Sequence, residues 1–179
     1  MPTTRLLIGA AALLTAASAS FGQQHQPAPR ADDGPSSLSE TYEDWRVACA
    51  AAADNKTTCS FSQVQVNQNG QRVLTVELMP AKDDGLNGIL VMPFGLNLDK
   101  GVTFAIDDTS PGKPSRFRTC LPGGCVVRLT FTQSTTAVLK SGSMLKLGAI
   151  ASDTEKDVTF SVSLKGFQRA LERTVQLRK

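Results

Sequence analysis

Between residues 45 and 164, apolar and polar side chains alternate one by one in segment after segment of the chain. The clearest segment has Val158, Phe160 and Val162 at every second position, with Thr or Ser between them. A period of two places the apolar set on one face of a β-strand. The pattern therefore predicts strands, not helices, over most of this region.

About nine segments carry strand signals, and turn residues such as Asn-Gly, Asp-Gly and Pro-Gly separate them. The predicted strands are residues 45–49, 58–66, 73–78, 88–92, 102–106, 116–120, 127–131, 145–149 and 158–164. Many short strands at regular spacing indicate an all-β domain with two antiparallel sheets packed face to face, although a small barrel would give a similar pattern.

The apolar period changes only near the C-terminus. Phe167, Ala170, Leu171 and Val175 recur at steps of three and four residues. This spacing is that of one helix face, so the sequence predicts a short amphipathic helix at the end of the domain.

The N-terminus has the organisation of a secretory signal peptide. Arg5 supplies a positive charge, and residues 6–17 carry almost no polar group. Small residues at 17–19 offer a cleavage site, and residues 20–22 offer a second candidate. The apolar run is shorter than the roughly 20 residues of a membrane-spanning helix. We expect residues 1–22 to be removed, which leaves a periplasmic or secreted protein of the Gram-negative cell envelope without a transmembrane segment.

Residues 23–40 are rich in Gln, Pro, Ala and Ser and contain almost no large apolar side chain. Such a segment cannot bury enough surface to offset the entropy lost on ordering, so it is predicted to be a flexible tether. Residues 41–179 are then the β-sandwich domain, which is long enough for one core.

The four cysteines are Cys49, Cys59, Cys120 and Cys125. An even number in an exported chain indicates two disulfides, for which three pairings exist. We favour Cys49–Cys59 and Cys120–Cys125, because Pro122 and two glycines allow the second pair a tight loop. The spacing lacks the Cys-x-x-Cys of zinc modules, so no metal site is predicted.

Catalytic groups are scarce in this sequence. The single histidine, His25, lies in the predicted tether, and oxidised cysteines would leave no thiol nucleophile. We therefore predict no catalytic residue and no cofactor. The formal net charge of +3 is too small to favour nucleic acid as a partner.

Several motifs together resemble a known family. They are Trp45-x-Val47-x-Cys49, Cys59 followed by Gln63, and residues 88–96, 101–107, 116–125 and 158–171. In this order, with all four cysteines, they are similar to the invasion-associated locus B family of exported Gram-negative proteins. The resemblance implies an immunoglobulin-like antiparallel β-sandwich, the cysteine framework, no catalytic residues and a link to host-cell invasion.

Two functional hypotheses follow. The first is a non-enzymatic envelope protein that binds an envelope or host protein through a rim around Cys120–Cys125, where Arg116, Arg118 and Pro122 are presented; disulfide stapling alone explains this loop equally well. The alternative is a carboxylate-based periplasmic enzyme or accessory factor using Asp107 and Asp108, although Asp is common in turns for its own hydrogen bonds.

Overall fold

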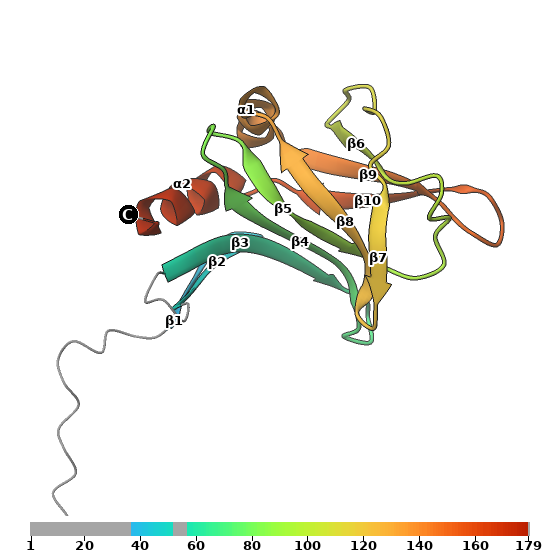
Figure 1. Cartoon of the computed structure of the whole chain (residues 1–179), viewed down its shortest axis with the longest axis horizontal. Helices are drawn as coiled ribbons and strands as arrows, with labels where there is room; N and C mark the ends of the chain where they lie inside the picture. Colours follow the sequence, from blue (N-terminus) through green and yellow to red (C-terminus); the bar gives the residue numbers. More distant parts are fainter. Residues whose placement is uncertain (1–36, 52–56, 179) are drawn as a thin grey trace, which may run out of the picture. The chain divides into compact units, whose positions relative to one another are not determined.

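The computed structural model describes residues 37–51 and 57–178, so the predicted signal peptide and most of the predicted tether lie outside the described residues. Figure 1 shows the arrangement of the elements. In chain order they are β1 (Ser37–Tyr42), β2 (Trp45–Ala51), β3 (Thr57–Val66), β4 (Arg72–Pro80), β5 (Leu86–Met92), β6 (Thr103–Ile106), β7 (Phe117–Leu121), β8 (Gly124–Phe131), α1 (Gln133–Ser141), β9 (Met144–Ile150), β10 (Asp157–Ser163) and α2 (Phe167–Leu177).

The strands form two antiparallel sheets. The large sheet has seven strands in the order β1-β2-β3-β4-β5-β8-β7, and the small sheet has three in the order β10-β9-β6. Phe104 of β6 contacts Phe131 of β8 edge to face, with ring centroids 6.2 Å apart, so the two sheets share one core. The predicted antiparallel β-sandwich with a short C-terminal helix is confirmed, and the barrel alternative is wrong because the sheets remain separate.

Alternating side chains supply the core, as the period of two predicts. On β2, Trp45 and Val47 are fully buried, and on β3 so is Phe61. The first residue of α2, Phe167, stacks edge to face on Trp45 with ring centroids 5.1 Å apart. Helix α2 therefore covers the inner face of the large sheet over β2 and β3.

Two elements differ from the sequence expectation. Strand β1 begins at Ser37, inside the stretch assigned to the tether, and α1 lies where no element is predicted. Thr132 caps α1, since its hydroxyl accepts a hydrogen bond from the Thr135 amide. In α2 the predicted stripe is shifted: Thr174 is buried, whereas Val175 is 46% exposed.

The buried amide of Gln63 joins the two sheets at the end of β10. Its Nε2 donates to the carbonyl oxygen of Ser163 at 2.9 Å, and its Oε1 accepts from the Ser163 amide at 3.3 Å. The indole of Trp45 donates to the same carbonyl at 2.9 Å. Side chains of the large sheet thus satisfy the backbone amide and carbonyl that Ser163 exposes at the free edge of β10.

Replacing Gln63 with methionine tests this junction. Methionine fills a similar volume but offers the Ser163 amide no acceptor, so Gln63→Met should lower the free energy of unfolding by about 1–3 kcal/mol. The matched control is Gln65→Met. Gln65 donates to the carbonyl oxygen of Ser161, which is exposed to solvent, and at 3.3 Å to Oε1 of Gln63, so its loss leaves both hydrogen bonds between Gln63 and Ser163 in place. Urea unfolding of both variants measures the difference, and equal losses would contradict the role given to Gln63.

Candidate functional site

Two disulfides staple neighbouring strands of the large sheet. Cys49 of β2 is bonded to Cys59 of β3, and Cys120 of β7 to Cys125 of β8, with Cα atoms 4.0 and 3.9 Å apart. In both pairs the partners lie directly opposite each other in the ladder. These are the pairings that the sequence favours, and the second one fixes the β7–β8 hairpin.

The hairpin presents the three rim residues as follows. Arg116 and Arg118 are exposed on either side of Phe117, which is half-buried and points inward. Both arginines line one surface hollow, together with Leu98 and Asp99. Pro122 is exposed at the hairpin tip and does not line this hollow. Within residues 37–51 and 57–178, neither arginine forms an ion pair, so both guanidinium groups are available to a partner.

Exposed apolar side chains lie on the β7–β8 hairpin and on the segment that follows β5, and the alternation of the sequence does not predict their exposure. Met92, the last residue of β5, pairs with Cys125, so the chain that leaves β5 passes beside the hairpin. Phe94 on this segment is 61% exposed, Leu98 is 44% exposed, and Leu121 in the hairpin is 56% exposed. The motif at residues 88–96 carries Phe94, but its period gives no sign that the ring lies in solvent.

The two candidate acid–base residues serve structural roles. The carboxylate of Asp107 accepts backbone hydrogen bonds from Ser143 at 3.1 Å and from Met144 at 2.9 Å. Asp108 is fully exposed and forms an ion pair with Lys146 at 3.2 Å. Although both carboxylates border one depression, Asp107 is held by the backbone, so the pair does not converge on a free position for a substrate.

In the described part of the chain, no three His, Cys, Asp or Glu side chains gather where they could hold a metal ion. The helices there are also too short and too polar for one of them to span a membrane.

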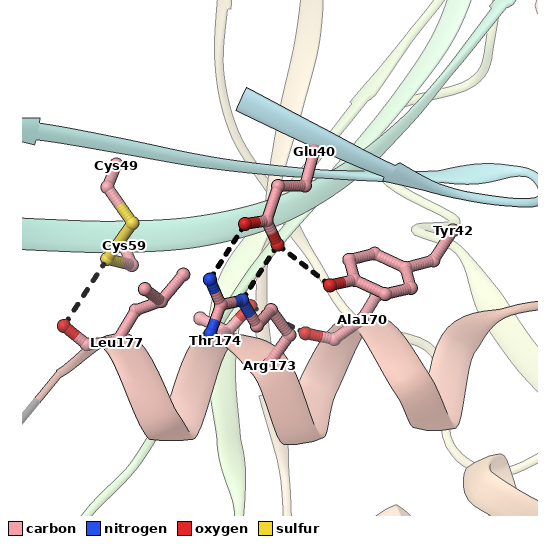
Figure 2. A network of polar contacts seen from close by, with 8 residues as sticks. All are labelled: Glu40, Tyr42, Cys49, Cys59, Ala170, Arg173, Thr174 and Leu177. Carbon is pink, nitrogen blue, oxygen red and sulfur yellow. Dashed lines mark hydrogen bonds and ion pairs between the residues drawn. A yellow bond between two sulfur atoms is a disulfide. The ribbon is translucent and has the colours of Figure 1, made fainter. Parts of the chain in front are cut away.

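An ion pair fixes β1 to α2 (Figure 2). Arg173 of α2 binds both carboxylate oxygens of Glu40, at 2.7 and 2.8 Å, and the Tyr42 hydroxyl donates to the same carboxylate at 2.7 Å. Hydrogen bonds from Arg173 and Tyr42 lower the pKa of Glu40 from 4.5 to about 2. The hydrogen bond to Glu40 raises the pKa of Tyr42 and that of Arg173.

Figure 2 also shows the first disulfide, between Cys49 and Cys59, near the end of the same helix. Sγ of Cys59 lies 3.9 Å from the carbonyl oxygen of Leu177. A disulfide sulfur carries no hydrogen, so this is a packing contact and not a hydrogen bond. Near the middle of α2, the Thr174 hydroxyl donates to the Ala170 carbonyl at 2.7 Å, which explains how a threonine is accommodated in the core.

These features define a class: a small antiparallel β-sandwich with two disulfides that presents an arginine-bearing hairpin. The family model described as "Invasion associated locus B (IalB) protein" matches residues 45–175. The chain therefore belongs to the invasion-associated locus B family, as the sequence resemblance indicates.

Relatives of known name agree with this assignment. An Invasion protein B homolog of Brucella abortus (strain 2308) is 44% identical over 147 residues, covering 82% of this chain and 84% of the relative. Invasion protein B of Bartonella bacilliformis is 33% identical over 176 residues, covering 94% of each chain. The crystal structure of invasion associated protein B from Bartonella henselae matches with a TM-score of 0.74 and 30% identity, over 79% of this chain and 97% of that one.

The pKa of Glu40 predicts how stability depends on pH. A carboxyl group with a lower pKa in the folded state stabilises that state above its unfolded pKa, and this stabilisation is lost as the pH falls. Glu40→Gln should therefore be less stable than the unmodified protein at pH 7, and the gap should close between pH 4.5 and about 2. Thermal unfolding across this range measures the gap.

The control for this series is Glu172→Gln on the same helix, because the carboxylate of Glu172 accepts a hydrogen bond from Gln168 and not from an arginine. Its stability difference from the unmodified protein should be small at pH 7. A gap for Glu40→Gln that stays constant down to pH 2 would contradict the role of the Glu40–Arg173 pair.

Proposed function

We propose that this chain is an exported, non-enzymatic protein of the bacterial cell envelope that binds a partner through the rim formed by Arg116, Arg118 and Pro122. The observation that carries the proposal is a pair of exposed arginines without ion-pair partners in the described chain, held on a disulfide-closed hairpin. The partner is an envelope or host protein.

Export to the periplasm or beyond is supported by two features. Residues 1–22, which lie outside the described residues, have the sequence organisation of a signal peptide. All four cysteines are paired in disulfides, and such bonds persist in oxidising compartments. The names of the relatives, Invasion protein B and its homologs, support a contribution to host-cell invasion.

The chemistry of the rim suits protein recognition. The planar guanidinium group of arginine can donate two parallel hydrogen bonds to one carboxylate. Arginine is also enriched among the residues that contribute most to binding energy at protein interfaces. Leu98, which is 44% exposed and lines the same hollow as both arginines, adds apolar surface beside them. Because the Cys120–Cys125 bond holds the hairpin in one conformation, binding loses less chain entropy than it would with an open loop. The rim therefore fits a partner surface that is apolar with carboxylates around it.

The test is capture of partners from the organism's own envelope extract by the tagged mature protein. The combined substitution Arg116→Ser, Arg118→Ser and Pro122→Ala should reduce capture at least about tenfold, because arginines at the centre of an interface each contribute more than 1 kcal/mol. Mass spectrometry identifies the proteins that are captured and lost.

The matched control removes positive charge elsewhere on the surface, at the exposed Lys82 and Lys156. Lys82→Ser with Lys156→Ser should leave capture unchanged. If the rim variant retained both full capture and the ability to complement a deletion strain, the rim would not be the binding surface.

A further inference from the structure

The outer face of the large sheet is more apolar than a solvent-exposed face usually is. Both helices and the small sheet pack on the opposite, inner face (Figure 1). On the outer face Val64 is 53% exposed, Ile89 39% and Met79 38%. In antiparallel sheets with one solvated face, outward residues are normally polar. No described part of the chain covers this face, so it is available to a partner.

The strand register arranges the outward side chains in rows across the sheet. One row is apolar apart from a threonine and runs through Val64, Thr75, Val91 and Val126. The next row runs through Ser62, Glu77, Ile89 and Arg128. In both rows the residue on β5 stands at the centre, between its neighbours on β4 and β8.

Opposite charges flank β5 symmetrically in the second row. Glu77 on β4 and Arg128 on β8 lie on either side of Ile89, each one strand away. With strands about 4.8 Å apart, the two charged residues are about 10 Å apart, too far for a direct ion pair. Among the described residues neither takes part in one. The row therefore carries two separated charges of opposite sign around an apolar centre.

A twofold axis parallel to β5, above this face, brings these charges together. Rotation about that axis places β4 of one copy over β8 of the other. Glu77 then faces Arg128 of the second copy, and the reverse contact forms as well, while Ile89 packs on Ile89 and Val91 on Val91. Aligned sheets packed about 10 Å apart are a common way of burying such faces.

We propose that this protein forms a twofold dimer in which the outer faces of two large sheets stack on each other along β5. The interface is isologous, since the same patch serves both copies. A second copy explains why the two charges are of opposite sign and equally distant from one central strand, which a foreign partner does not require. The charge exchanges at Glu77 and Arg128 leave the rim residues unchanged, so the two proposals are tested separately.

Charge exchange between β4 and β8 tests the geometry. The mature protein should sediment as a dimer at micromolar concentrations in analytical ultracentrifugation. Glu77→Arg alone, or Arg128→Glu alone, places like charges opposite each other at two symmetric points and should raise the dimer Kd at least about tenfold. The double variant restores opposite charges and should return the Kd to within about threefold of the original. Circular dichroism verifies that each variant is folded.

Arg46→Glu is the matched control on the same row. Arg46 pairs with Ser62 and so lies three strands from β5, whereas only β8 and β7 lie on the other side of β5. The second copy has no strand above Arg46, so its reversal should not change the Kd. A protein that stays monomeric at all concentrations would overturn the proposal. A dimer Kd that is unchanged by the single substitutions, or not restored by the double substitution, would also overturn it.

Discussion

The two layers of this domain depend on the backbone amide and carbonyl groups of Ser163. The side chains of Trp45 and Gln63, both on the large sheet, bond to these groups and so close the free edge of β10. Three residues later the chain turns at Gly166, whose φ is 82°. A Cβ there would lie 2.0 Å from the Tyr42 carbonyl oxygen, so only glycine lets the chain pass this closely and start α2 against β1.

Much of this architecture could be predicted from the period of two. All nine predicted strands exist, because apolar side chains facing one core impose alternation on each of them. Strand β1 could not be predicted in this way, because it is held in place by contacts distant in the sequence. It pairs with β2, and its Glu40 binds Arg173, which is 133 residues away. Helix α1 was not predicted because its sequence is rich in Thr and Ser and has low helix propensity. The helix is stabilised instead by its N-cap and by Leu139 in the core.

Some surface features could likewise be predicted from the sequence, and others could not. Alternation around Phe117 predicts that Arg116 and Arg118 point outward, and the structure agrees. The exposure of Phe94 was not predictable, because it depends on the path of the chain after Met92, and a period cannot show that path. Periodicity could not reveal the apolar outer face either, because Ile89 and Val91 belong to β5, and both faces of this strand carry apolar residues. That face becomes visible only when the strand register is known.

Side chains of the large sheet close the free edge of β10 at Ser163. Residue-resolved hydrogen–deuterium exchange by NMR tests this closure directly, because the amides of Thr159 and Ser163 both point to this edge, where alternate residues of an antiparallel strand face away from the neighbour. The Ser163 amide donates to Gln63, so it should exchange as slowly as amides in the core strands. Exchange of Ser163 as fast as that of Thr159 would contradict this closure.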